Sequence, residues 1–552
     1  MTLIEPELQE NPTRVVFNQP PPLEGYNLYL ENRPLAEAAR REGAAWAEDR
    51  LLEMGAEAGG DPIEWGRLAN ENPPVLRSHD RYGNRIDEVE FHPAWHWLME
   101  MSIRHGTHAL PWREERPGAH AARAAIMLTG SALESGHGCP ISMTYAAIPA
   151  LRKQPDVAAE WEPRLTSLVY DRRMIPADQK DGAICGMAMT ERQGGSDVRA
   201  NTTLARQRPD GDWEVTGHKW FCSAPMSDVF LILAQTESGL SCFLLPRFTP
   251  DGERNRFHIN RLKDKLGNRS NASSEIELDA AYAQLVGDEG RGVPTIIEMV
   301  NHTRLDCVIG STGLVREAVA QATHHCAHRA AFGKLLIDQP LMQNVLADLS
   351  IESEADTLTT MRLARAYDEA QAGDEEAALF KRVATAVSKY WICKSATWTV
   401  GEALECLGGN GYVEESKMPR LYREAPLNSI WEGSGNVNSL DVLRAMVKAP
   451  GSIDAFMREL DSTRGSEPRL DAYVRTLKDE LADLDGIEFR ARRIVERMAV
   501  ALQGSIVVRH ADPAVADAFC ASRLAGDRGR AFGTLPKGVD CTRIVERHRP
   551  QV

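Results

Sequence analysis

Two adjacent glycines in the first half of the chain lie among residue types that can bind a flat ring or a phosphate. Gly194 and Gly195 let the backbone turn tightly and approach a ligand. The hydroxyls of Thr190 and Ser196 accompany backbone N–H groups that suit a ring carbonyl or phosphate oxygen. The complete run is Met189-Thr190-Glu191-Arg192-Gln193-Gly194-Gly195-Ser196-Asp197-Val198. An ordinary surface turn has a similar composition, so this run alone leaves both interpretations open.

Four further runs combine glycine, aromatic and polar side chains. Trp220 and Phe221 follow an expected strand and could stack on a flat ligand, although such residues are more often part of a core. Glycines after a long expected helix could admit a phosphate or simply end the helix. The runs are Gly217-His218-Lys219-Trp220-Phe221-Cys222-Ser223, Arg329-Ala330-Ala331-Phe332-Gly333 with the later Gln343, Leu407-Gly408-Gly409-Asn410-Gly411-Tyr412, and Ile430-Trp431-Glu432-Gly433-Ser434-Gly435-Asn436.

The elements that must position these runs change in type along the chain. Residues 1–185 show short helices and loops broken by prolines. Residues 186–292 contain short β-type runs between turns, which indicates a small sandwich or barrel. Residues 293–449 have helical periodicity with short connections, typical of an antiparallel bundle. With a last helical segment over 450–552, the sequence predicts a mainly α fold with a central β-domain (α+β) and these four domains.

Composition and charge limit the classes of function. The chain has 552 residues and a formal net charge of −15, which argues against a generally basic coat on nucleic acid or an anionic membrane. Ten cysteines without a CxxC pair and without zinc-ligand spacing predict reduced thiols and no metal site. The acidic N-terminus has no apolar region typical of a signal peptide. The apolar runs are too short to span a bilayer, so we expect a cytoplasmic protein without a membrane partner.

The order and spacing of the five runs resemble the acyl-CoA dehydrogenase flavoprotein family over about residues 90–445. Within that family the chain is similar to the AidB subfamily, the bacterial flavoproteins of the DNA-alkylation response, and this similarity includes the C-terminal residues that ordinary members lack. It implies an acyl-CoA dehydrogenase-like fold plus an extra C-terminal helical domain. The supporting segments are Val16-Phe17-Asn18-Gln19-Pro20, Phe91-His92-Pro93-Ala94-Trp95-His96, Leu262-Lys263-Asp264-Lys265-Leu266-Gly267-Asn268-Arg269-Ser270-Asn271-Ala272 and Leu421-Tyr422-Arg423-Glu424.

The resemblance also implies FAD between the β-domain and the bundle, and a homotetramer built as a dimer of dimers. The residues expected at the flavin ring and the nearby pyrophosphate are Met189, Thr190, Gly195, Ser196, Asp197, Trp220 and Ser223. Those expected to hold the pyrophosphate and adenine of FAD in a neighbouring subunit are Arg329, Phe332, Gln343, Gly408, Gly409 and Gly411. Those expected to complete the site are Trp431, Gly433, Ser434 and Asn436.

Glu432 takes the position of the family's catalytic base. Removal of the proton α to a thioester carbonyl needs a base on one face of the substrate, while a flavin on the other face accepts hydride from Cβ. A carboxylate whose pKa is raised by a partly apolar site would suit this role. The alternative is that Glu432 stabilises the following helix through its N-terminal dipole. Trp431 stands where many members have tyrosine and would narrow the acyl pocket.

Basic residues are concentrated at the C-terminal end of the chain. Residues 490–552 contain twelve Lys and Arg against six Asp and Glu, a net charge of +6, which leaves −21 for the first 489 residues. The alternative is a solvated helix face with ion pairs such as Arg492–Glu496. By resemblance, the extra domain binds double-stranded DNA, and without a base-reading motif we expect mostly phosphate contacts. The candidate contacts are Arg444, Arg490, Arg493, Arg497, Arg523, Arg528 and Arg530.

The sequence leaves three functions to be weighed. The first is an FAD-containing, duplex-binding protein of the alkylation response, which protects DNA and keeps a weak acyl-CoA dehydrogenase capability. The second is a catabolic dehydrogenase of a fatty or branched acyl-CoA. The third is direct flavin-dependent repair of alkylated bases, for which no base-flipping or zinc-deaminase signature is found.

Overall fold

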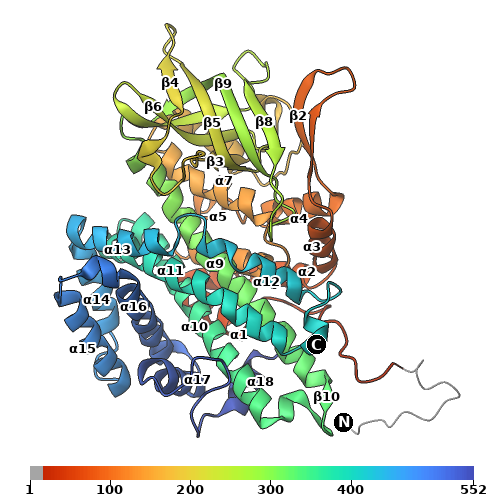
Figure 1. Cartoon of the computed structure of the whole chain (residues 1–552), viewed down its shortest axis with the longest axis vertical. Coiled ribbons are helices and arrows are strands. Elements are labelled where there is room, and N and C mark those ends of the chain that lie inside the picture. Colours follow the sequence, from red (N-terminus) through yellow and green to blue (C-terminus); the bar gives the residue numbers. More distant parts are fainter. Residues whose placement is uncertain (1–15) are drawn as a thin grey trace, which may run out of the picture.

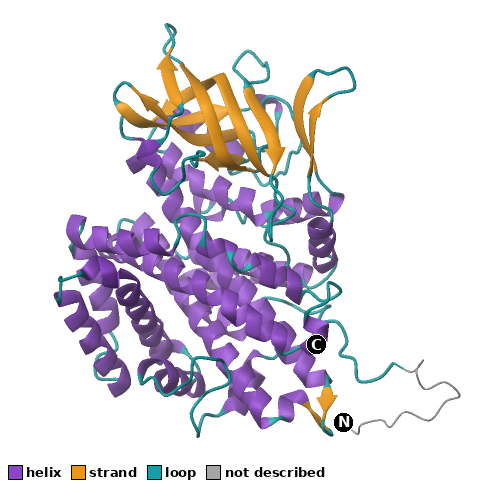
Figure 2. Ribbon diagram, viewed as in Figure 1, coloured by secondary structure: helices purple, strands orange, loops and turns teal. Residues whose placement is uncertain are grey.

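Except for one two-residue hairpin, the strands gather at one end of the molecule, and long helices fill the rest (Figures 1 and 2). The computed structural model describes residues 16–552. This arrangement confirms the predicted α+β fold with a central β-domain and helices at the C-terminal end. Within the described residues, no helix is both long enough and apolar enough to cross a membrane, and no group of His, Cys, Asp or Glu could hold a metal ion.

Short helices form most of the N-terminal part. Proline stands in the first turn of five of them, because its fixed φ suits that position and its missing N–H leaves no bond unmade. An antiparallel hairpin lies between α3 and α4. The sequence did not predict it, since its strands are largely polar and half-exposed. The elements are α1 Arg33–Ala39, α2 Glu48–Ala58, α3 Pro62–Glu71, β1 Val75–His79, β2 Arg85–Glu90, α4 Pro93–Arg104, α5 Leu110–Arg113, α6 Ala119–Ser131, α7 Gly138–Leu151 and α8 Pro155–Leu165.

The central β-domain is a small barrel. Its antiparallel pairs β4–β5, β5–β9, β9–β7 and β7–β6 form a ring that a parallel contact between Leu204 and Gln235 closes. The apolar strands β6 and β7 pair from Val229 opposite Pro246 to Thr236 opposite Gly239 and lie in the core. The strands are β3 Cys185–Ala188, β4 Leu204–Gln207, β5 Trp213–Ser223, β6 Val229–Thr236, β7 Gly239–Pro246, β8 Phe257–Leu262 and β9 Ser273–Val286.

Three long helices form the centre of the bundle. Helical periodicity in the sequence predicts helices over roughly 293–330, 341–370, 379–407 and 436–448, and the structure has a helix within a few residues of each range. A two-residue hairpin, β10 with β11, follows the first of them at the end of the molecule opposite the barrel (Figure 1). The elements are α9 Gly292–His328, β10 Ala330–Ala331, β11 Lys334–Leu335, α10 Pro340–Gln371, α11 Glu375–Glu405, α12 Met418–Glu424 and α13 Gly435–Lys448.

The C-terminal helices pack against the bundle and share its core. On α16, an apolar stripe of Ala491, Ile494, Met498 and Leu502 faces the interior, where one continuous apolar cluster includes bundle residues such as Val387. Deletion of this segment would therefore expose apolar surface of α10 and α11. The helices are α14 Gly451–Asp461, α15 Pro468–Ala482, α16 Ile487–His510, α17 Pro513–Phe519 and α18 Cys541–His548.

Candidate functional site

The half-buried side chain of Glu432 is held in place by the helical bundle. Thr303, on α9, donates a hydrogen bond from its hydroxyl to Glu432 Oε2 at 2.7 Å. Burial raises the pKa of Glu432, and this effect outweighs the Thr303 hydrogen bond and the charges of Lys389 and Arg304. A carboxyl group with a raised pKa is a stronger base once it is ionised, so the environment suits proton abstraction.

The backbone around Glu432 is strained and fixed by two buried cations. Glu432 has a φ of 55°, a region that residues other than glycine seldom adopt. Lys389 Nζ donates to the carbonyl oxygens of Trp431, at 2.7 Å, and Gly433. Arg304 Nε donates to the carbonyl oxygen of Glu432 itself at 3.0 Å. Three successive carbonyl groups thus have charged donors, and the loop is held in one conformation.

The helix-stabilising alternative for Glu432 lacks a contact to support it. Ser434 is the N-cap residue of α13, and no side chain caps this helix. The carboxyl group of Glu432 instead accepts from Thr303 of another helix. Sequence analysis did not identify Thr303, Arg304 or Lys389, because their role depends on contacts across the bundle. The one local indication of a functional role was the pair Thr303-Arg304, a threonine followed by an arginine in the largely buried helix α9.

The glycine loop after β3 is attached to β5 by a buried ion pair. Lys219 Nζ lies 2.9 Å from Glu191 Oε1, and both side chains are inaccessible to solvent. The other oxygen of Glu191 accepts from the backbone N–H of Thr202 at 2.7 Å. The backbone N–H of Trp220 donates to the carbonyl oxygen of Thr190 at 2.8 Å. These bonds bring Met189, Thr190, Gly195 and Ser196 to the same edge of the barrel as Trp220.

Trp220 and Phe221 are not part of the barrel core, so the core interpretation of this pair is wrong. Phe221 is exposed and Trp220 half-buried, and the Lys263 ammonium lies 3.9 Å from the Trp220 ring centroid. Ser223, at the end of the same strand, is near Cys139, whose surroundings also include Glu432 and Asn271. Ser223 and Glu432 are therefore both close enough to Cys139 to affect the pKa of its thiol.

Among the predicted FAD residues, those expected to serve a neighbouring subunit lie at the opposite end of the molecule, around the β10–β11 hairpin and the glycine loop after α11 (Figure 1). Phe332, beside β10, is fully exposed. The N-terminal segment joins this region to the glycine loop after α11: Asn18 Nδ2 donates to the carbonyl oxygen of Ala330 at 2.9 Å, and Asn410 Nδ2 donates to Gln19 Oε1 at 3.2 Å. Within one chain this group is therefore separated from the flavin-ring group, as expected for residues that serve a neighbouring subunit.

The donor chemistry of both groups fits FAD. The ring group offers the hydroxyls of Thr190, Ser196, Ser223 and Ser434 beside polar backbone. A Cβ on Gly195 would lie 2.3 Å from Thr190 Oγ1, so this turn requires glycine. In the distal group, Cβ atoms on Gly408 and Gly409 would meet nothing within 4 Å, which leaves the backbone open to a phosphate.

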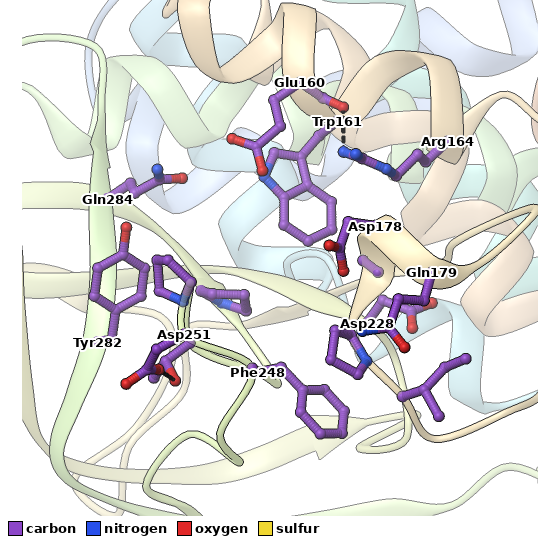
Figure 3. Close-up of a pocket in the computed structure, with 17 residues that line it drawn as sticks. Glu160, Trp161, Arg164, Asp178, Gln179, Asp228, Phe248, Asp251, Tyr282 and Gln284 are labelled. Carbon is purple, nitrogen blue, oxygen red and sulfur yellow. Dashed lines mark hydrogen bonds between the residues drawn. The ribbon is translucent and has the colours of Figure 1, made fainter.

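A separate pocket of about 490 Å³ lies between α8 and the barrel (Figure 3). Its walls include Trp161, Phe248 and Tyr282, with Glu160 and Asp251 around them (Figure 3). None of the predicted site residues lines it. Carboxylates at its edge would repel the phosphates of a CoA thioester or of DNA, so this pocket suits neither ligand.

The predicted DNA-contacting arginines differ in their surroundings. Glu480 pairs with Arg493 at 2.9 Å and with Arg497 at 3.2 Å, and Asp483 pairs with Arg490 at 3.1 Å. Over 450–552 the chain has seventeen Lys and Arg against sixteen Asp and Glu, a net charge of +1. The charge of +6 counted from residue 490 is thus largely balanced by carboxylates of the preceding helices.

Arg523 is misplaced in the predicted DNA-contacting set. Its guanidinium lies 2.8 Å from Glu352 Oε1, and 5% of its side chain is exposed, because the turn after α17 packs onto α10. Arg528 lies 3.6 Å from the same carboxylate and stays partly exposed. Arg444 and Arg530 are exposed and form no ion pair with the described residues. The Arg492–Glu496 ion pair of the alternative interpretation does not form, because Arg492 turns toward Tyr390.

Known protein families match three successive parts of the chain. The N-terminal domain of the adaptive response protein AidB matches residues 18–172. The middle and C-terminal domains of acyl-CoA dehydrogenase match residues 186–281 and 290–447.

Individual relatives extend these matches over nearly the whole chain. AidB of Escherichia coli (strain K12) is 46% identical over 92% of this chain and 94% of its own length. Acyl-CoA dehydrogenase family member 11 of Caenorhabditis elegans is 30% identical over 81% of this chain and 74% of its own. The crystal structure of C. elegans ACDH-11 in complex with C11-CoA has a TM-score of 0.85, with 26% identity over 98% of each chain. The apo-form of Bd2924 has a TM-score of 0.82, with 29% identity over 90% of this chain and all of that one.

Proposed function

Because the chain belongs to the AidB group of the acyl-CoA dehydrogenase family, we propose that it is an FAD-containing, duplex-binding protein of the adaptive response to DNA alkylation that retains α,β-dehydrogenation chemistry at Glu432. The observation that carries the chemical part is the half-buried Glu432 carboxyl group, held by Thr303 in a fixed loop. The name of the matching N-terminal domain supports the biological part.

Glu432 takes the α proton of an acyl-CoA thioester in this proposal. Thr303 orients the carboxyl group, and Arg304 and Lys389 hold its backbone. When bound, FAD supplies the acceptor for the hydride that leaves Cβ. Thr190, Ser196, Trp220 and Ser223 would hold its ring, and Phe332 with the Gly408–Gly411 loop would serve the FAD of a neighbouring subunit. The full exposure of Phe332 supports this last role and the proposed tetramer.

The test of the chemical part is anaerobic reduction of the bound flavin by acyl-CoA substrates. Short, branched and long acyl-CoAs are compared with the intact protein. Slow bleaching of the flavin absorbance with acyl-CoAs of every chain length fits a weak residual dehydrogenase activity. Turnover on one chain length within the usual enzyme range of roughly 1–10³ s⁻¹ favours the second candidate, a catabolic dehydrogenase. That candidate is supported by the intact Glu432 loop and by the C11-CoA complex of the C. elegans relative.

Double-stranded DNA would bind to the C-terminal part through phosphate contacts. The exposed Arg444 and Arg530 form no ion pair with described residues, and Arg528 is partly free. The positive charges of Arg490, Arg493 and Arg497 are partly compensated, because each guanidinium has a carboxylate partner. We therefore expect moderate, salt-sensitive affinity with little sequence preference. Protection of DNA by occupancy needs no further chemistry, and a cytoplasmic location remains a prediction.

Duplex binding is best tested with point variants, since deletion of 450–552 would uncover the bundle core. Affinity is measured at several salt concentrations for the full chain and for Glu480→Gln. Loss of the Glu480 charge frees Arg493 and Arg497, so the variant should bind more tightly and with a steeper salt dependence. Equal binding by both proteins would remove this face of α16 from the proposed interface.

A further inference from the structure

Two cationic side chains connect the C-terminal helices to the loop that follows Glu432. Arg492 is on α16 and Lys394 on α11, and both approach Gly435, the first residue of α13. A Cβ on Gly435 would lie 3.5 Å from Arg492 Nη2 and 3.3 Å from Lys394 Cε. Tyr390 lies beside both: Arg492 Nε donates to its hydroxyl at 3.4 Å, and Lys394 Nζ lies 5.9 Å from its ring centroid.

No carboxylate of the described residues forms an ion pair with either cation. The neighbouring Arg493 and Arg497 point to Glu480, whereas Arg492 points to the bundle. Lys389, also on α11, is the third positive charge of this cluster. Its ammonium donates hydrogen bonds to the carbonyl oxygens of Trp431 and Gly433. The pKa of Lys394 is lowered by burial and by the charges of Arg492 and Lys389. An anion placed among these groups would relieve their mutual repulsion.

The position of the cluster indicates which anion it would bind. Gly435 lies between Ser434 and Asn436, two residues of the predicted FAD set. A side chain at this position would occupy the space next to the guanidinium, so glycine leaves room for an oxygen atom there. Guanidinium and ammonium groups form strong charge-assisted hydrogen bonds with phosphate. Arg492 is exposed like the proposed DNA contacts Arg444 and Arg530, but its guanidinium lies beside Tyr390 of α11 and Gly435 of α13.

We propose that Arg492 and Lys394 bind a phosphate group of FAD, so that the extra C-terminal helices form part of the flavin site. The inference rests on the proposed function, because it takes FAD as the cofactor of this chain. It gives α16 a role that the ordinary three-domain dehydrogenase fold does not contain. Flavin affinity would then depend on the docking of the C-terminal helices against α11 and α13.

The test is a fluorescence titration of flavin-free, full-length protein with FAD. Arg492→Gln and Lys394→Gln should each weaken FAD binding by about tenfold, the effect of one charge-assisted hydrogen bond. Arg492→Lys should keep part of the affinity. The control is Arg475→Gln, an exposed arginine of α15 in the same segment, which should bind FAD like the unaltered protein. Thermal melting of each flavin-free variant reports whether it is folded.

Each outcome decides the proposal. Unchanged FAD affinity in folded Arg492→Gln and Lys394→Gln overturns it, as does weaker duplex binding with unchanged FAD affinity, which would assign the cations to DNA. A weakening that Arg475→Gln shares also overturns it, since the effect would then be one of overall charge. If the unaltered protein bound no FAD, the proposed function itself would fail. FAD binding that is insensitive to these substitutions would refute only the role of Arg492 and Lys394.

Discussion

Thr303 and Glu432, 129 residues apart in the chain, share a 2.7 Å hydrogen bond in which the threonine hydroxyl donates to the carboxylate. Burial raises the pKa of Glu432, and the Thr303 hydrogen bond opposes part of that rise. The pair thus sets both the direction of the carboxyl group and the pH range in which it is a base.

Replacement of Thr303 should move the pH profile of flavin reduction. The base acts in its ionised form, so the rate rises as pH increases through the pKa of Glu432. Thr303→Val removes the donor, raises this pKa further and shifts the profile to higher pH. Thr303→Ser keeps the hydroxyl and should keep the profile. The measurement is the rate of anaerobic flavin reduction by acyl-CoA across pH, and identical profiles for Val and Ser would contradict the role.

Loss of the Glu432 carboxylate should greatly slow proton abstraction without loss of the flavin. Glu432→Gln preserves size and can still accept from Thr303, but it cannot take a proton. We expect flavin reduction by acyl-CoA to fall by about 10²–10⁴-fold, the usual contribution of a general base. Flavin content and duplex binding serve as controls and should be unchanged. A variant that reduces its flavin at the original rate would show that another group is the base.

The conformation of the strained loop around Glu432 should depend on Lys389. Lys389→Met removes the ammonium that donates to the carbonyl oxygens of Trp431 and Gly433. Both carbonyl oxygens then lack this charged donor. Because the loop positions Glu432 and does not itself bind the acyl chain, kcat should fall by about tenfold or more with a smaller change in KM. Lys381→Met, on the same helix, is the control, since its ammonium lies 4.6 Å from the Tyr367 ring. An equal loss in both variants would indicate a general effect on the bundle.

Exposed arginines without a partner should contribute more to duplex binding than paired ones. Arg444→Gln and Arg530→Gln should each weaken binding and reduce the slope of log K against log salt by about 1. Arg523→Gln should leave that slope unchanged, because this guanidinium is buried against Glu352. Arg77→Gln, in the β1–β2 hairpin, is the control for loss of charge far from the C-terminal part. The same slope in the Arg444 and Arg530 variants as in the unaltered protein would exclude these two contacts.

Glu354, a buried carboxylate of α10, should stabilise the packing of the last helix, α18, against the bundle. Glu354 Oε2 lies 2.9 Å from Arg547 Nε and 3.1 Å from His548 Nε2. Burial alone would raise the pKa of Glu354, but these partners lower it to about 2. The stabilisation is therefore present above the ordinary carboxyl pKa and is lost as pH falls toward about 2.

Urea denaturation of Glu354→Gln at neutral pH measures this contribution. The free energy of unfolding should fall by about 3 kcal/mol, as for a broken buried pair. Glu37→Gln removes the other partner of Arg547, which is half-exposed, and should cost about 1 kcal/mol or less. Equal losses in the two variants would contradict the dominance of the buried pair.

The sequence by itself determined the order of the elements and the family. Helical periodicity over the apolar positions of α9 to α13 and the alternation of short strands depend on local spacing, which the chain carries directly. The motifs around Thr190, Trp220, Phe332, Gly408 and Glu432 identify the family for the same reason. The β1–β2 hairpin was missed because its strands are polar and half-exposed, so no apolar pattern predicts them.

Only the tertiary structure decided which charges are free and which groups support Glu432. Arg490, Arg493 and Arg523 look alike in the sequence, but two have surface carboxylate partners and one is buried against α10. Thr303 and Lys389 contact the Glu432 loop from two helices that are distant from it in the chain. Coulombic and hydrogen-bond energies depend on distances of a few ångströms between such elements, and those distances are set by packing of the whole bundle.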